Sequence, residues 1–212
     1  MVNKMIETTK TSVEGDKTND TRTVLLCGVG GQGTITAASL LARAAAAAGF
    51  DVKVSEIHGM AQRGGAVTTV VRFGTGVQSM VADPGETDCI VSFETMEALR
   101  NIAFLKKDGY LLVADESIKP LPVACGTAEM PSDIPVSLNE HGATIIPAIE
   151  LALEAGNIRT ENVVLLGALE TTLGFGKDVW SDVIRACVPP KTIDANLKAF
   201  DMGFSFAENH QS

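Results

Sequence analysis

The sequence lacks the features that mark several common classes of protein. Its four cysteines are far apart, at Cys27, Cys89, Cys125 and Cys187, and no two of them have the spacing of a zinc or iron–sulfur motif. No apolar run approaches the length of a membrane span, and the first 22 residues contain no apolar signal core. We therefore predict a cytoplasmic protein with buried, reduced thiols, no membrane contact and no metal centre of its own.

Aromatic residues and positive charge are also scarce. Only 5% of the 212 residues are aromatic whereas 45% are hydrophobic, so the core must consist of Ala, Val, Leu and Ile. This usage favours a parallel sheet flanked by helices over a β-sandwich. The net charge of -9 would repel the phosphates of nucleic acids, which argues against a general nucleic-acid-binding protein.

The order of the first predicted elements indicates an α/β fold. A buried strand over Thr23–Cys27 leads into a glycine-rich turn over Gly28–Gly33, a helix over Ile35–Ala48 and a second strand over Val52–Ile57. This succession is typical of the opening of a Rossmann-like fold. We therefore predict a three-layer sandwich with a mostly parallel sheet and C-terminal helices.

The same patterns assign the rest of the chain. We predict one domain over residues 23–212, preceded by a polar, disordered tail over residues 1–22. The four prolines of Ser117–Pro135 indicate a long connection or an irregular lobe. Further strands are predicted at Ala66–Phe73, Cys89–Phe93 and Tyr110–Ala114, with two more candidates at Val77–Val81 and Ile134–Leu138, and further helices at Glu94–Leu105, Thr144–Glu154, Thr160–Leu173, Val179–Cys187 and Ile193–Glu208.

A glycine motif follows the first predicted strand. Gly28, Gly30 and Gly33 fit the pattern G-x-G-x-x-G, with Gly31 as an additional glycine and Thr34 directly after the motif. Such glycines permit a tight turn, a close approach of the backbone to a phosphate and close packing of helix against strand. N–H groups at the start of the following helix then face an anion. The turn could contact a phosphate-bearing cofactor directly, border a partner subunit's cofactor pocket, or serve only as a tight turn.

Several polar residues near this turn are further candidates for cofactor binding. The Arg63 guanidinium could hold a phosphate or carboxylate through two hydrogen bonds, and Glu56 could orient it or bind a ribose hydroxyl. His58 is a candidate proton donor. The simpler interpretation of each is a surface, interface or structural side chain. The full set of candidates around the turn is Gln32, Glu56, His58, Gln62, Arg63 and Gly64.

Two segments together resemble a known family. Gly28–Gly33 (GVGGQG) and Ser55–Gly65 (SEIHGMAQRGG) are similar to the gamma-type domain of 2-oxoacid:ferredoxin oxidoreductases. The string HGMAQRGG resembles the small (beta, gamma-type) subunit of the indolepyruvate branch more than the pyruvate or 2-oxoglutarate branches. Asn162–Ala168 and Asn196–Phe200 also match that subunit. The resemblance covers about residues 24–204, although Ser117–Pro135 carries no recognisable motif.

The resemblance implies an enzyme that works only as a complex. In this family a 2-oxoacid, which is an aryl pyruvate in the indolepyruvate branch, is decarboxylated on thiamine diphosphate. Electrons then pass through 4Fe-4S clusters to ferredoxin, and coenzyme A takes the acyl group. A larger partner subunit carries the thiamine diphosphate and the clusters. The present chain would accordingly hold no cofactor alone, be inactive alone, and contribute part of a shared binding cleft.

Other functions fit the same residues. The chain could belong to a pyruvate or other 2-oxoacid:ferredoxin oxidoreductase. It could be a stand-alone NAD(P)-dependent dehydrogenase that uses the glycine turn for the pyrophosphate and Glu56 for the ribose. It could also be a nucleotide-sensing module without a redox partner. The leading hypothesis requires Gly30 and the Arg63 segment to line one crevice.

Overall fold

The structure is a computed structural model, and it describes residues 21–58 and 64–210. Residues 1–20 of the predicted tail lie outside the described residues, and the first strand already begins at Arg22, within the range predicted as tail. In chain order the strands and helices are β1 (Arg22–Val29), α1 (Thr34–Ala47), β2 (Asp51–His58), β3 (Ala66–Gly74), β4 (Thr87–Ser92), α2 (Thr95–Asn101), β5 (Leu105–Ala114), α3 (Leu121–Ala124), α4 (Ile134–Glu140), β6 (Thr144–Ile146), α5 (Ala148–Glu154), α6 (Glu161–Leu173), α7 (Lys177–Cys187) and α8 (Ile193–His210).

The strands form one sheet in the order β2-β3-β1-β4-β5-β6. Three of its five strand pairs are parallel, which confirms the mostly parallel sheet, and β3 runs antiparallel to both β1 and β2. Antiparallel strands need only a short connection, so β2 and β3 can follow each other directly. As a result β3 separates β1 from β2, although these two strands flank the glycine turn and α1 in the sequence.

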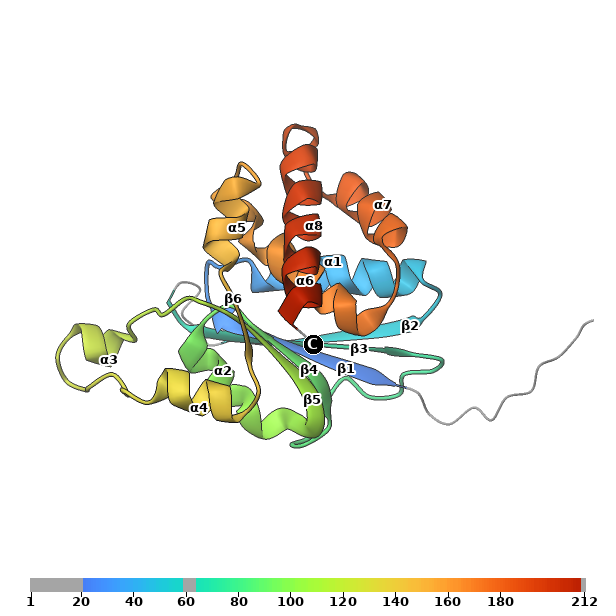
Figure 1. The fold of residues 1–212 in the computed structure, drawn as a ribbon. Helices are drawn as coiled ribbons and strands as arrows, with labels where there is room; N and C mark the ends of the chain where they lie inside the picture. Colours follow the sequence, from blue (N-terminus) through green and yellow to red (C-terminus); the bar gives the residue numbers. More distant parts are fainter. Residues whose placement is uncertain (1–20, 59–63, 211–212) are drawn as a thin grey trace, which may run out of the picture.

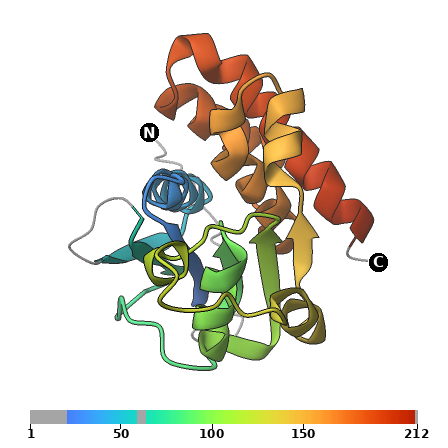
Figure 2. The same ribbon diagram turned by 90° about the vertical axis from the view of Figure 1, so that its left-hand side faces the viewer.

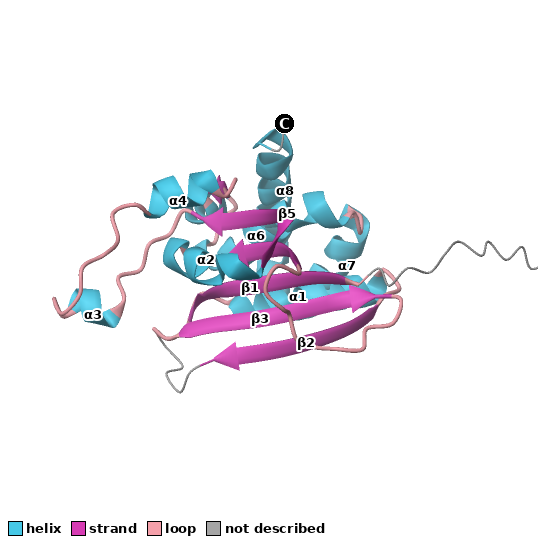
Figure 3. Cartoon of the chain, turned by 90° about the horizontal axis from the view of Figure 1, so that it is seen from below, coloured by secondary structure: helices cyan, strands magenta, loops and turns pink. Residues whose placement is uncertain are grey.

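Helices on both faces of the sheet make three layers, as predicted. Because side chains alternate along a strand, Val24 and Leu26 of β1 join one core, whereas Leu25 and Cys27 join the other. The first core is covered by α1, α5, α6, α7 and α8, and the second by α2 and α4 (Figures 1 and 2). On the side of α2 and α4, no helix of the described chain lies over β2 and β3 (Figure 3).

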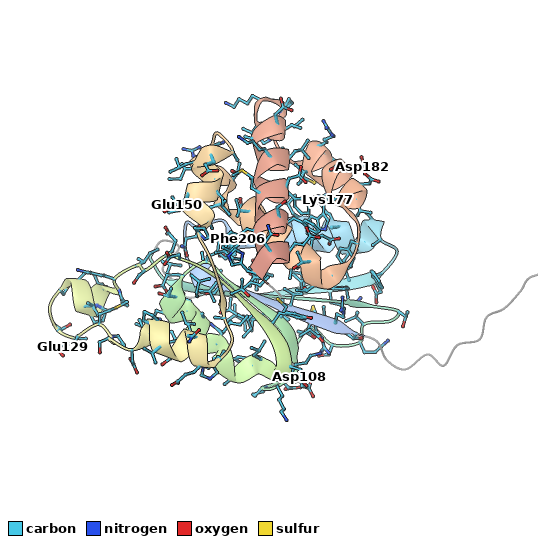
Figure 4. The ribbon with its side chains drawn as sticks, in the orientation of Figure 1. Asp108, Glu129, Glu150, Lys177, Asp182 and Phe206 are labelled. Carbon is cyan, nitrogen blue, oxygen red and sulfur yellow. The ribbon has the colours of Figure 1, made fainter. Side chains whose placement is uncertain are left out.

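The helical layer above the sheet is packed very closely. A Cβ atom added to Gly203 of α8 would lie 1.9 Å from the carbonyl oxygen of Val164, and one added to Gly167 of α6 would lie 2.0 Å from that of Phe200. The two helix backbones are therefore in direct contact. Beside them, Lys177 of α7 forms an ion pair with Asp201 of α8 (Figure 4).

The opposite layer is thinner and ends in a projecting lobe. After β5 the chain extends away from the sheet through α3 and returns to it at α4 (Figure 1). This segment agrees with the irregular lobe predicted over Ser117–Pro135. Glu129 lies at its outer part, away from the helical layer (Figure 4).

Some predicted elements differ from the structure. Val77–Val81 forms no strand; this loop is held by Arg72, whose Nη1 donates to the Val81 carbonyl at 2.7 Å. Ile134–Leu138 is helix α4 instead of an edge strand, with a proline in its first turn, a position that suits the fixed φ of proline. The helix predicted from Thr144 begins only at Ala148, because residues 144–146 form the short strand β6.

The helix predicted over Glu94–Leu105 is also shorter than expected. Helix α2 ends at Asn101, and Leu105 already begins β5. Of the four thiols, Cys27 and Cys89 are buried as predicted, but Cys125 and Cys187 are exposed. None of the described helices is long and apolar enough to cross a membrane.

Candidate functional site

The glycine turn joins the carboxyl end of β1 to the start of α1. Gly31 and Gly33 have φ values of 114° and 86°, which L side chains rarely adopt, and Gly33 is the residue that precedes α1. A Cβ atom on Gly28 would lie 2.8 Å from the Cβ of Phe93, so this glycine permits close packing of β1 against the end of β4. The three positions therefore need glycine for conformation or for space.

The Gln32 side chain holds the turn in shape. Its Oε1 accepts from the Val29 N–H at 2.8 Å, and its Nε2 donates to the Phe93 carbonyl at 2.7 Å. The amide thus links the end of β1 to the end of β4. These contacts give Gln32 a structural role, and contact with a ligand remains a prediction for it.

Thr34 places a hydroxyl at the start of α1. Its side chain is only 3% exposed, and its Oγ1 has no hydrogen-bond partner within residues 21–58 and 64–210. The first-turn N–H groups of a helix also have no acceptor inside that helix. Together with Gly30, Gly31 and Gly33, Thr34 lines an open pocket of about 280 Å³. The pocket can therefore offer hydrogen-bond donors to an anion.

The second recognised segment returns to this turn. The Gly30 N–H donates to the Gly65 carbonyl at 2.8 Å, and the Gly64 N–H donates to the Gly30 carbonyl at 3.3 Å. The end of the HGMAQRGG string is therefore adjacent to the glycine turn, but Gly30 and Gly64 line different pockets, so a single shared crevice stays a prediction. The N–H of Gly30 is engaged by Gly65, which leaves anion binding to the N–H groups further along the turn. Gln62 and Arg63 lie outside the described residues.

Glu56 and His58 lie on the edge strand β2. The Glu56 side chain is exposed and borders a groove along the outer side of α1 that also contains Val54 and Ala42. It does not line the glycine-turn pocket, because β3 separates its strand from β1. His58 is the last residue of β2, and its side chain is not described. A dehydrogenase that binds ribose through Glu56 would need this carboxylate beside the glycine turn, so the geometry argues against that function.

A second pocket, of about 230 Å³, is lined in part by Gly64 and shares Val29 with the first pocket. Its wall contains Glu94, Glu97 and Arg100 of the α2 region and Lys119 of the lobe. Glu94 is 1% exposed, and its carboxylate accepts from the Glu97 N–H at 2.8 Å and from the Ile118 N–H at 3.1 Å. The first contact makes Glu94 the N-cap of α2, and the second attaches the lobe to α2.

Glu161 of α6 and Glu97 of α2 are partly shielded carboxyl groups with a raised pKa. Burial, together with repulsion from Glu116, raises the pKa of Glu161 to about 7. Burial also raises the pKa of Glu97, although Arg100 opposes this through an ion pair of 2.6 Å. Sequence reasoning missed both residues, because a glutamate in the first turn of a helix is usually an exposed partner of the helix dipole.

The fold and the glycine turn define a Rossmann-like α/β domain. Within that class, the chain belongs to the pyruvate ferredoxin/flavodoxin oxidoreductase family, which it matches over residues 23–206. It is 46% identical over 192 residues to the indolepyruvate oxidoreductase subunit IorB of Pyrococcus horikoshii, a match that covers 87% of this chain and 95% of the relative. It is 30% identical over 152 residues to the pyruvate/ketoisovalerate oxidoreductases common subunit gamma of Pyrococcus abyssi, covering 71% and 77%.

A solved structure agrees with this assignment. The keto/oxoacid ferredoxin oxidoreductase gamma subunit of Geobacter sulfurreducens superposes with a TM-score of 0.66 at 26% identity, covering 89% of this chain and 99% of that one. The resemblance drawn from the two sequence segments is therefore confirmed.

Proposed function

We propose that this chain is the small subunit of an indolepyruvate:ferredoxin oxidoreductase, which converts an aryl pyruvate to an acyl-coenzyme A. The observation that carries the proposal is the 46% identity to the IorB relative along nearly its whole length. The identity to the pyruvate/ketoisovalerate subunit is lower, at 30% over 152 residues. The indolepyruvate branch therefore fits better than the pyruvate branch.

The redox groups belong to a larger partner subunit in this proposal. Within the described residues, no three His, Cys, Asp or Glu side chains are grouped so as to hold a metal ion. A 4Fe-4S cluster needs four closely placed ligands, which are generally cysteines, so the described part of this chain does not fit one. Thiamine diphosphate, the clusters and the route to ferredoxin are assigned to the partner.

The glycine turn contributes one wall of a cleft that the partner completes. The left-handed glycines and the first-turn N–H groups of α1 fit a phosphate group, because they present donors at a helix start in an open pocket. The Thr34 hydroxyl is buried close to Gly28 without a partner among the described residues, and it adds a donor when its side chain rotates toward the pocket. Coenzyme A is the phosphate-bearing cofactor that we assign to this wall. Arg63, two residues before Gly65 in the sequence, stays a predicted phosphate ligand on sequence grounds.

Reconstitution tests the proposed activity. The full chain, co-expressed with its larger partner, should reduce ferredoxin when supplied with indolepyruvate, thiamine diphosphate and coenzyme A, with a higher kcat/KM for indolepyruvate than for pyruvate. The chain purified alone should show no turnover. Turnover by the isolated chain, or a preference of the complex for pyruvate, would contradict the proposal.

A single substitution tests the cleft. Thr34→Val keeps the shape of the side chain and removes the unpartnered hydroxyl, so folding stability should not fall. We expect KM for coenzyme A in the complex to rise roughly tenfold, with a smaller change in kcat, because one hydrogen bond to a charged group is lost. Thr75→Val, on an exposed loop residue, is the matched control. An unchanged KM would remove the glycine turn from the coenzyme A site.

A further inference from the structure

A larger cavity, of about 600 Å³, lies on the side of the sheet that α1, α6 and α8 cover. Its walls come from the first turns of α1, from the start of α6, and from the connection between α7 and α8. It shares Thr36 with the glycine-turn pocket, and their other lining residues differ. Cavities of this size hold ligands as large as a nucleotide.

The polar wall of this cavity is positively charged. It contains Arg159 and Lys191, and none of the described residues that line it is a carboxylate. Neither cation takes part in an ion pair in the part of the chain that the structure describes. Both side chains are exposed, so they can contact a ligand that enters the cavity. An anionic ligand would pair with both through charge-assisted hydrogen bonds.

Two asparagines add hydrogen-bond donors to the same wall. Asn157 Oδ1 accepts from the Arg159 N–H at 3.1 Å, which leaves the amide NH₂ group of Asn157 for another partner. Asn162 is only 8% exposed, and its side chain forms no hydrogen bond within residues 21–58 and 64–210. Its amide atoms are not fully shielded, so they are open to a ligand in the cavity. A ligand oxygen in the cavity would satisfy the Asn162 NH₂ group.

Backbone dipoles point to the same kind of ligand. Helix α6 begins at Glu161 and helix α8 at Ile193, and residues of both first turns line the cavity. The positive ends of two long helices thus reinforce the two side-chain cations. Val163, Val188 and Pro189 supply an apolar part of the wall. Such a site suits a ligand with a charged end and an apolar or aromatic body.

We propose that this cavity binds a phosphate-bearing small molecule of nucleotide size, separately from the glycine turn. Arg159 and Lys191 hold the phosphate, and the amide of Asn162 donates to it or to the adjoining sugar. The apolar wall covers the base or another flat group. This inference uses residues other than those of the proposed coenzyme A wall, so either can fail without the other.

Titration of the full chain with ADP, followed through its backbone amide NMR signals, tests the site. The largest shifts should fall on residues 157–163 and 188–196. The double variant R159Q/K191Q should bind ADP at least roughly tenfold more weakly, because it loses two charge-assisted contacts. The control R43Q/K107Q removes the same charge from exposed residues outside this cavity and should bind as the wild type does.

Two outcomes would overturn the proposal. One is equal ADP affinity of R159Q/K191Q and the wild type when both give native amide spectra. The other is a set of shifts confined to residues 29–36, which would place the phosphate at the glycine turn. Thr34→Val separates the two sites, because it should leave the shifts at residues 157–163 and 188–196 unchanged. Turnover of the complex tests the proposed function, whereas ADP binding to the chain tests the proposed nucleotide site, so the two can fail separately.

Discussion

The two faces of the sheet differ in how closely their helices are packed. On the side of α6 and α8, the helix backbones touch at Gly167 and Gly203 within a large apolar core, and the buried carboxylate of Glu170 accepts from Trp180 Nε1 at 2.7 Å. On the side of α2 and α4, a small apolar core is supplemented by the buried carboxylate of Glu94, which binds backbone N–H groups of α2 and of the lobe.

Because of this difference, we expect the α6–α8 pair to be rigid and the lobe to be able to change position. Packing of backbone against backbone leaves no room for a side chain to rearrange, so the α6–α8 pair is fixed by shape. A lobe attached by hydrogen bonds can move when one or two of them break, because each contributes only about 1 kcal/mol net. The pocket between Gly64 and the lobe lies on the side of α2 and α4, next to the glycine turn.

The largest expected effect of a substitution is on the side of α6 and α8. Gly203→Ala would place a Cβ atom 1.9 Å from the Val164 carbonyl oxygen, so α8 must move away from α6. We expect a loss of at least about 3 kcal/mol in the free energy of unfolding, measured by urea denaturation followed by circular dichroism. Gly76→Ala, where no atom lies within 4 Å of the new Cβ, is the matched control. A Gly203→Ala chain as stable as this control would contradict the comparison.

A smaller and more local effect on stability is expected on the side of α2, α4 and the lobe. Glu94→Ala removes the acceptor of the Ile118 and Glu97 N–H groups. Hydrogen exchange should accelerate at residues 117–124, while the free energy of global unfolding falls by about 1–2 kcal/mol. Glu129→Ala, on the outer part of the lobe, controls for charge (Figure 4). If exchange rises equally throughout the helical layer, the lobe is not an independently adjustable unit.

The sequence predicted one of these two sides better than the other. The strand, glycine turn and helix over residues 22–47 follow from local patterns, and so does the apolar helix α6, whose continuous apolarity indicates burial. Pairing is not local: no pattern in Ala66–Gly74 states that this strand lies between β1 and β2. The three-residue strand β6 is too short for periodicity to detect. In α4 the apolar residues are few and partly β-branched, a pattern that favours a strand when the sequence is considered alone.

The candidate site also contains features that local sequence predicts and others that depend on long-range contacts. Glycines with positive φ could be recognised from their motif, whereas the roles of Gln32 and Asn162 depend on neighbours that are distant in sequence. Gln32 is held by Phe93, and Asn162 lies against Gly33. Side chains that serve such long-range contacts carry no local signal, so only the folded chain shows which donors stay without a partner.

The smallest expected effect concerns Glu161, where the two sides meet. Its pKa in the folded chain is about 7, raised from 4.5 by burial and by repulsion from Glu116. The folded chain therefore binds this proton more tightly than the unfolded chain does, so stability falls as the pH rises from about 5 through 7. Glu161→Gln mimics the protonated form and removes this dependence.

The variant should therefore match the wild type near pH 5 and exceed it near pH 8. We expect a difference of about 1 kcal/mol at pH 8, reduced by solvent screening because part of this carboxyl is exposed. Urea denaturation across this pH range measures it, and Glu150→Gln, on the exposed side of α5, should keep the wild-type profile (Figure 4). If Glu161→Gln is instead the less stable chain at pH 8, the folded chain stabilises the Glu161 carboxylate as an anion, and burial does not raise its pKa.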